Sequence, residues 1–303
     1  MKPIAGKRIL VCGKGGSGKS TIVALMADVL QKKGYRALVL DGDASNPDGL
    51  IRLMFGGGVN SEPKPLLEFF GGIDVVTCPV DDPSPLTRVD DAVPVPEKKI
   101  DIDREIPSEY AVKKRGISLF QAGKIETYGQ GCDGPIEKVV RDFMVEGEWV
   151  SLIDMKAGIE HFGRKIPDTM DMILVVLDPT LESVSIAKRI EGFCRKTGME
   201  NFWLILNKIG SKEMESMMRE RLGELKGRVV GSVAYDSGLV ERELSGGFLF
   251  MRSATFLPSR SPISTALRSR SGNPARPTAA RIRPQLGSPA NRAVFTSGEW
   301  AIV

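Results

Sequence analysis

A three-layer α/β fold, with a doubly wound and mostly parallel sheet between two layers of helices, is predicted by three features of this sequence. Short apolar segments of strand length alternate with longer amphipathic segments from residue 8 to residue 244. Residues 172–177 are apolar throughout, as expected of a parallel strand covered on both faces. Polar residues gather directly after several apolar segments, at the edge where open parallel sheets bind their ligands.

Each element is predicted from its own pattern. The first helix, expected at residues 20–33, carries apolar residues at helical spacing, namely Ile22, Leu25, Met26 and Val29. The other helices are expected at residues 135–145, 181–195, 213–225 and 238–244, and the strands at residues 8–11, 36–40, 117–120, 149–153, 172–177, 202–206 and 228–234. Residues 55–110 are rich in glycine, proline and aspartate with short apolar runs such as 73–76, so we expect loops and one or two strands there.

Charge divides the chain into a body and a tail. Residues 251–303 hold eight arginines, no lysine and one acid, which leaves 34 basic and 37 acidic residues in positions 1–250. The body is therefore slightly acidic although the whole chain has a formal charge of +4, and we expect no nucleic-acid or membrane surface on it. We predict one domain over residues 1–247 and an Arg/Ser/Pro-rich tail over 248–303 that is disordered. A basic arm and a shifted reading frame are the alternatives for the tail.

Hydropathy and cysteine usage predict a cytoplasmic protein. No stretch approaches the ~18 uninterrupted apolar residues of a membrane span, and the N-terminus runs into the first strand without a signal-peptide core. The cysteines lack the spacing of a disulfide framework, so any special role belongs to single thiols; they are Cys12, Cys78, Cys132 and Cys194.

A phosphate-binding loop follows the first expected strand. Residues 13–20 match the spacing G-x-x-x-x-G-K-[ST]. Glycines let backbone N–H groups close around phosphates, Lys19 reaches the terminal phosphates, and Ser20 ligates Mg²⁺. The motif predicts a nucleoside triphosphate held by Gly13, Gly15, Gly16, Ser17, Gly18, Lys19, Ser20 and Thr21.

A second lysine, Lys14, makes this loop resemble the deviant Walker A motif of the P-loop NTPase group that includes MinD, ParA, the arsenite pump and the nitrogenase iron protein. The resemblance implies a nucleotide-sandwich homodimer, in which Lys14 crosses to the partner's phosphates and stabilises developing charge. A surface lysine in an ordinary monomeric P-loop protein is the alternative.

Two aspartates at strand ends complete the implied catalytic set. Residues 41–46 match the D-x-D-x-x-N spacing of the group's first switch. In that switch the second aspartate positions the attacking water and senses the γ-phosphate, so the resemblance implies these roles for Asp43. Asp154 ends an apolar strand and resembles the Walker B carboxylate, which holds Mg²⁺ through water. Alternatively, Asp41 and Asp43 only form a turn or cap a helix at the end of the strand. The catalytic residues implied are Lys14, Lys19 and Asp43, and the Mg²⁺ residues are Ser20 and Asp154.

The segment after Asp154 narrows the resemblance. Residues 157–164 read A-G-I-E-H-F-G-R, which resembles the CooC-type nickel-insertion ATPases that mature carbon monoxide dehydrogenase. That family often carries an acidic residue where this chain has Lys156. His161 is the only histidine, and we expect it to pack rather than to ligate. The resemblance covers about residues 6–247 and implies a nickel-enzyme client of the carbon monoxide dehydrogenase class.

The metal motif of that family is half present. The family has G-x-G-C-x-C-P before a helix, and residues 129–135 read G-Q-G-C-D-G-P. In the family, two C-x-C pairs meet across the dimer axis and bind Ni²⁺ or Zn²⁺ through four thiolates. With Gly134 in the second position, only Cys132 from each chain would meet at the dimer interface, and further ligands such as Asp133 or His161 would be needed. A small residue at a tight interface is the alternative role of Cys132.

Asn207 and Lys208 follow the strand expected at 202–206 and resemble the group's N-K element for base recognition. An asparagine amide can pair with the adenine amino group. The chain reads N-K-I-G here and lacks the aspartate of the guanine-reading N-K-x-D element, so ATP is preferred over GTP. A simple turn residue is the alternative for Asn207.

The combined prediction is a cytoplasmic, homodimeric ATPase that uses ATP and Mg²⁺ to assist nickel insertion. One alternative is a MinD/ParA-like positioning or partition ATPase, but the proline-rich tail lacks the periodicity of a terminal membrane helix. A second alternative is an iron–sulfur reductase. It is disfavoured because the nitrogenase iron protein takes its second cluster cysteine from the switch segment after the Walker B aspartate, and no cysteine follows Asp154 in this segment. A metal-free degenerate paralogue is a third.

Overall fold

A nine-stranded sheet forms the centre of the protein. The computed structural model describes residues 3–46, 49–56 and 62–245, with three residue pairs at 256–257, 295–296 and 301–302. The strands of the sheet are β1 (Arg8–Gly13), β2 (Arg36–Gly42), β3 (Ala111–Lys114), β4 (Ile117–Gln121), β5 (Trp149–Met155), β6 (Met172–Leu177), β7 (Phe202–Ile209), β8 (Val229–Ala234) and β9 (Phe256–Leu257). Their order is β3-β4-β2-β5-β1-β6-β7-β8-β9, and all neighbours pair in parallel except β3 and β9 at the two edges. A separate antiparallel pair joins β10 (Phe295–Thr296) to β11 (Ala301–Ile302).

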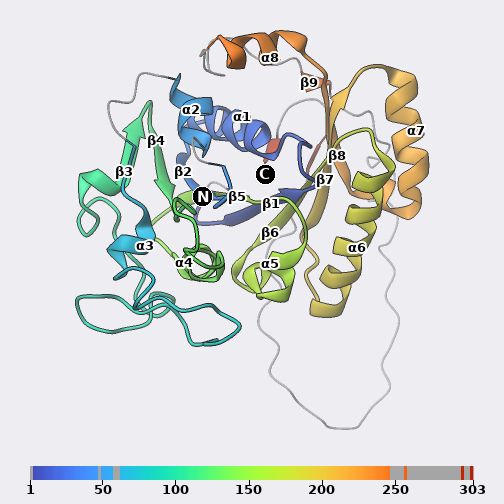
Figure 1. The fold of residues 1–303 in the computed structure, drawn as a ribbon. Coiled ribbons are helices and arrows are strands. Elements are labelled where there is room, and N and C mark those ends of the chain that lie inside the picture. Colours follow the sequence, from blue (N-terminus) through green and yellow to red (C-terminus); the bar gives the residue numbers. More distant parts are fainter. Residues whose placement is uncertain are drawn as a thin grey trace, which may run out of the picture.

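Helices cover both faces of the sheet and make the three-layer fold that the sequence predicts (Figure 1). One face carries α1 (Lys19–Lys32), α2 (Gly49–Phe55) and α8 (Ser237–Leu244). The other carries α3 (Leu66–Phe69), α4 (Gly134–Asp142), α5 (Glu160–Gly163), α6 (Leu181–Thr197) and α7 (Lys212–Leu222). Along β1, Ile9 and Val11 join the apolar cluster under α1, while Leu10 and Cys12 join the opposite cluster. Because strand side chains alternate between faces, a strand between two helix layers must be apolar throughout.

The segment before β3 differs from expectation. The described residues 62–110 hold α3, turns and isolated bridges but no strand, and the run 73–76 forms turns. Gly71 and Gly72, with φ of +98° and +77°, break the extended conformation before this run. Only Val76 of the run is buried, so the run contributes one side chain to the core and forms no hydrogen-bonded strand pairing. Most of the tail expected at 248–303 lies outside the described residues.

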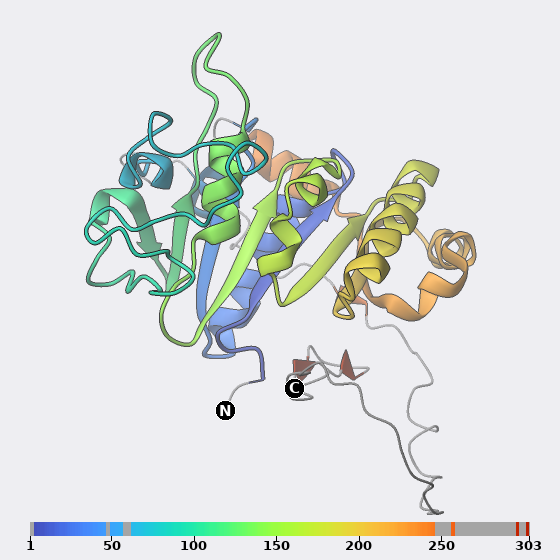
Figure 2. The same cartoon turned by 90° about the horizontal axis from the view of Figure 1, so that it is seen from below.

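The carboxyl ends of the parallel strands meet at one edge of the sheet. The loop after β1, the aspartates at the ends of β2 and β5, and the polar residues that end β6 and β7 all lie there. Figure 2 shows the segment between β4 and α4 extending beyond the same edge. The fold therefore brings the predicted phosphate loop and the predicted cysteine loop to one side of the molecule.

Candidate functional site

The loop between β1 and α1 has the backbone that a phosphate-binding loop needs. Gly13, Gly16 and Gly18 have φ of +141°, +73° and +92°, a region that favours glycine. A Cβ at Gly13 would lie 2.4 Å from the carbonyl oxygen of Val176 in β6. The predicted phosphate-binding residues 13–21 thus run from the end of β1, through a turn at 14–18, into the first residues of α1.

Both lysines of the loop have partners in their own chain. The Lys19 Nζ donates a hydrogen bond to the carbonyl oxygen of Lys14 at 3.2 Å. The Lys14 Nζ lies 3.1 Å from Asp178 Oδ2 and 3.7 Å from Glu182 Oε2. The hydrogen bond with Asp178 raises the pKa of Lys14. Lys14 is therefore a cation whose charge is neutralised at the beginning of α6.

The two residues predicted at Mg²⁺ lie in contact. The Ser20 Oγ donates a hydrogen bond to Asp154 Oδ2 at 2.6 Å, and Asp154 Oδ1 is buried without a hydrogen-bond partner. Burial, followed by repulsion from Asp41, raises the pKa of Asp154 to about 7. A buried carboxylate with a free oxygen beside a hydroxyl fits a hard divalent cation. Mg²⁺ bound by Ser20 and Asp154 would supply positive charge for the phosphate oxygens.

A buried ion pair lies next to Asp43. The Lys124 Nζ is 2.9 Å from Asp41 Oδ2 and donates a second hydrogen bond to the carbonyl oxygen of Asp43 at 2.6 Å. The Asp43 carboxylate accepts hydrogen bonds from the backbone N–H and hydroxyl of Ser45, which is a turn geometry. Sequence reasoning missed the Asp41–Lys124 pair. Residues 123–125 read G-K-I, which matches a G-K-[IV] element that precedes the cysteine motif in the CooC-type family, but nothing in this element identifies the partner of Lys124.

Asn207 and Lys208 both brace the phosphate loop. The Asn207 Nδ2 donates to the carbonyl oxygen of Ser17 at 2.8 Å, and the Lys208 Nζ donates to that of Gly16 at 2.7 Å. Asn207 is buried. The structure therefore gives these two residues a supporting contact with the loop, and their role in base recognition stays a prediction.

Cys132 is exposed at the end of the cysteine loop, the segment 122–133 that leads into α4. The next residue, Asp133, pairs with Lys156 and with Arg164, the latter at 2.7 Å. Glu137 in the first turn of α4 pairs with the same two cations, at 3.3 and 2.8 Å. These four charged side chains, here called the ion cluster, tie the start of α4 to the segment that follows β5.

The additional ligands considered for Cys132 do not gather around it. Among the residues that the structure describes, no group of three or more His, Cys, Asp or Glu side chains can hold a metal ion. Asp133 is occupied by the ion cluster. His161 is 0% exposed, lies with its ring 4.8 Å from that of Phe162, and burial lowers its pKa to about 4. His161 is thus a neutral packed side chain, and the described residues of one protomer give Cys132 no complete ligand set.

Comparison with known proteins identifies the family. The CobQ/CobB/MinD/ParA nucleotide binding domain family matches residues 9–249. This chain belongs to that family. It is 34% identical over 243 residues to an uncharacterized ATP-binding protein of Methanocaldococcus jannaschii, a match that covers 79% of this chain and 92% of that protein. It is 29% identical over 243 residues to the carbon monoxide dehydrogenase accessory protein CooC of Rhodospirillum rubrum, covering 79% of this chain and 88% of CooC.

Solved structures share the fold. A ParA family ATPase from Chlorobium tepidum superposes with a TM-score of 0.54 at 17% identity, covering 80% of this chain and 89% of that chain. The septum site-determining protein MinD from Pyrococcus horikoshii, complexed with Mg-ADP, superposes with a TM-score of 0.53 at 14% identity, covering 80% and 86%. These matches confirm the predicted three-layer fold.

Family membership and the phosphate-loop geometry together make this chain a nucleotide-binding, ATP-hydrolysing P-loop ATPase of the MinD/ParA group, with a sequence similar to that of CooC. In the part of the chain that the structure describes, every helix is too short or too polar to cross a membrane.

Proposed function

We propose that this ATPase is a homodimeric switch that carries nickel and assists its insertion into an enzyme of the carbon monoxide dehydrogenase class. The ion cluster carries the proposal, because it joins the start of α4, beside Cys132, to the segment that follows Asp154. A movement of that segment when ATP binds or is hydrolysed passes to Cys132 through direct side-chain contacts.

The phosphate loop, in this proposal, binds ATP through its glycine backbone. Lys19 and Lys14 stabilise charge on the phosphates, and Asp43 orients the attacking water. Ser20 and Asp154 hold Mg²⁺. The residues that enclose the nucleotide are Gly13, Gly15, Gly16, Ser17, Gly18, Ser20 and Thr21, with Asn207 and Lys208 on the side of the base.

Lys14 connects nucleotide to the dimer. In one protomer it pairs with Asp178 and Glu182. When two protomers face each other, Lys14 leaves these carboxylates and binds the partner's phosphates. The phosphates carry a higher density of negative charge than the carboxylates that Lys14 leaves. ATP thus favours the closed dimer and hydrolysis favours reopening, which gives metal transfer a direction.

The relatives support nickel delivery over a positioning function. CooC matches over 79% of this chain at 29% identity, whereas the MinD of Thermotoga maritima matches over 66% at 25% identity. We assign the switch to residues 1–247 and treat 248–303 as a separate tail. The proposed site of action is the cytoplasm.

Metal content of the whole chain tests the proposal. The protein is purified anaerobically, loaded with Ni²⁺ or Zn²⁺, and measured with and without a non-hydrolysable ATP analogue. We expect about one metal ion per two chains with the analogue, and its loss in Cys132→Ser. A wild-type protein that binds no metal in either condition would overturn metal delivery and leave an ATPase with another cargo.

A further inference from the structure

Cys78 lies against the position at which the metal motif is incomplete. A Cβ built on Gly134 would lie 2.6 Å from Cys78 Sγ and 2.7 Å from Cys78 Cβ, closer than real side chains approach one another. Gly134 is buried, whereas Cys78 is partly exposed. The Cys78 side chain therefore fills the space that a side chain at position 134 would take.

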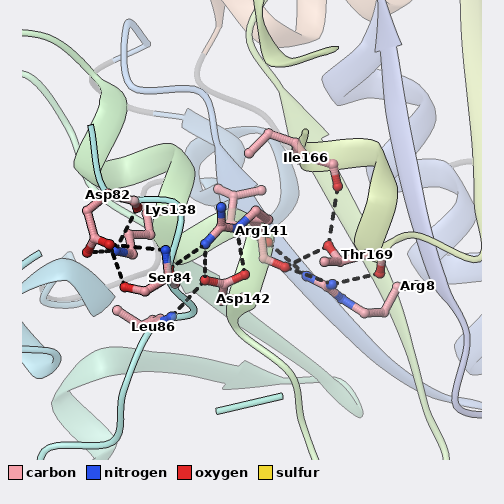
Figure 3. Close-up of polar contacts among 10 residues, drawn as sticks. Arg8, Asp82, Ser84, Leu86, Lys138, Arg141, Asp142, Ile166 and Thr169 are labelled. Atoms are coloured by element: carbon pink, nitrogen blue, oxygen red, sulfur yellow. Dashed lines mark hydrogen bonds and ion pairs between the residues drawn. The ribbon is translucent and has the colours of Figure 1, made fainter. Parts of the chain in front are cut away.

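A turn holds Cys78 along the face of α4 that begins with Gly134. The carbonyl oxygen of Cys78 accepts hydrogen bonds from the backbone N–H groups of Asp81 and Asp82, at 3.0 and 2.9 Å. The Asp82 carboxylate lies 2.6 Å from the Lys138 Nζ (Figure 3). Lys138 follows Gly134 by about one helical turn, so both residues lie on the same side of α4. The turn is thus fixed to the helix directly below the position of Cys78.

Further contacts extend this attachment to the end of α4. Arg141 Nη2 donates to the carbonyl oxygen of Ser84 at 2.9 Å, and the backbone N–H of Leu86 donates to Asp142 Oδ2 at 2.8 Å (Figure 3). On the other side, the Arg8 guanidinium donates to two carbonyl groups in the last turn of α4, at 2.8 and 3.0 Å. Segment 78–86, α4 and β1 form one packed unit, in which Cys78 has a defined place.

We infer that Cys78 supplies the second thiolate of each protomer, beside Cys132, to a soft or borderline divalent cation. The inference rests on the proposed metal-delivering function and names the ligands of that site. Cys78 packs against Gly134 and Cys132 precedes Gly134 by two positions, so both cysteines adjoin the N-terminal end of α4. Two protomers supply four thiolates, the closed tetrahedral set that suits Zn²⁺ and that soft thiolate ligands favour. The site is complete only when a second copy contributes its pair.

A thiol swap tests this assignment most sharply. The double variant Cys78→Gly with Gly134→Cys moves the thiol across the contact and keeps the thiol count. Gly134 is the first residue of α4 and its φ is not positive, so once the Cys78 side chain is gone the backbone accepts a side chain there after a small shift from the Cα of residue 78, which lies 3.2 Å from the new Cβ. The comparison set is wild type, Cys78→Ser, Cys132→Ser, the swap, and Cys194→Ala, which removes a buried thiol from α6 as the matched control.

Anaerobic binding of Ni²⁺ and Zn²⁺ to the full chain, with the ATP analogue present, is the measurement. We expect about one metal ion per two chains in wild type, the swap and Cys194→Ala. Cys78→Ser and Cys132→Ser should each bind at least ~10-fold more weakly, since even supporting residues of metal sites contribute that much.

The outcomes separate this inference from the function on which it rests. Wild-type affinity in Cys78→Ser, together with loss in Cys132→Ser, would overturn the role of Cys78 and leave metal delivery standing. A wild type without metal would overturn both. If Cys78→Ser fails to fold, the swap decides, because a folded swap variant that binds no metal contradicts the assignment.

Discussion

The phosphate loop begins, and the cysteine loop ends, next to a glycine whose side-chain space is filled, but different parts of the molecule fill it. At Gly13 the space is closed by backbone, the carbonyl oxygen of Val176 at 2.4 Å from an added Cβ. At Gly134 it is closed by a side chain, the Cys78 thiol at 2.6 Å. The phosphate loop is therefore specified by its own motif and strand, whereas the cysteine loop is completed by a residue far earlier in the chain. A motif that is incomplete along the sequence can be complete in space.

The largest effect is expected at the phosphate loop. Lys14→Ala should retain nucleotide binding but lower ATP turnover by roughly 10³-fold or more, the range for a cation supplied across an interface. Steady-state phosphate release and equilibrium binding of an ATP analogue measure the two quantities. Glu182→Gln, which alters the more exposed partner of Lys14, is the control and should stay near wild type. Unchanged ATP turnover in Lys14→Ala would contradict the mechanism in which Lys14 acts across the dimer.

Gly13→Ala tests the glycine whose side-chain space is closed by the backbone of β6. A positive φ and a clash with a strand carbonyl should together lower the free energy of unfolding by roughly 2–5 kcal/mol. Gly16→Ala, also at positive φ but with nothing within 4 Å of its added Cβ, should cost only about 1–2 kcal/mol. Urea midpoints compare the two variants. Equal losses would mean that the contact with Val176 is unimportant.

Asp154 gives the phosphate side a pH dependence of folding stability near neutral pH. Its pKa of about 7 lies above that of the unfolded chain, so the native state holds a proton that the unfolded state has lost, and stability falls as pH rises through this window. Without Mg²⁺, we expect the free energy of unfolding to fall by about 2–3 kcal/mol between about pH 5 and pH 7.5, a loss that is absent in Asp154→Asn. Urea unfolding at both pH values checks it, and the same slope in wild type and variant would contradict it.

Gly134→Ala tests the glycine whose side-chain space is filled by Cys78. The clash with Cys78 should cost about 1–2 kcal/mol, and Cys78→Gly should relieve most of it, because the obstacle is a side chain. A double-mutant cycle of urea midpoints measures the coupling. Additive losses in the double variant would show that Cys78 and Gly134 do not share this space.

The smallest effect concerns the link between the two loops. Lys156→Gln removes one of the two cations of the ion cluster but leaves Arg164 on both carboxylates. We expect the ATP analogue to change metal affinity less than about 5-fold in this variant, at the lower end of ordinary coupling. Metal titrations with and without the analogue measure it. Wild-type coupling in the variant would remove Lys156 from the connection.

Most of the fold was predictable from the sequence because buried parallel strands leave a clear apolar signal. The run 172–177 became β6 with the same bounds, and the expected helix 181–195 became α6, two residues longer. The run 73–76 misled, since two glycines precede it and most of it is exposed. A short apolar run predicts a strand only where neighbouring strands can pair with it.

The site was predictable where recognised motifs name both residues of a contact. Ser20 and Asp154 meet as their motifs imply. The pairs Asp41–Lys124 and Cys78–Gly134 were not predictable, because no motif names both members of either pair. Without such a motif, a contact between distant segments leaves no signal in a single sequence that identifies the partner.

In the proposed mechanism, ATP closes a dimer around a shared thiolate-bound metal. Native mass measurement of the full chain with Ni²⁺ and an ATP analogue, under anaerobic conditions, is the decisive experiment. We predict a dimer that holds a nucleotide in each protomer and about one nickel ion in all, and that dissociates when the analogue is removed. Monomers that each retain their own nucleotide and metal would contradict the claim.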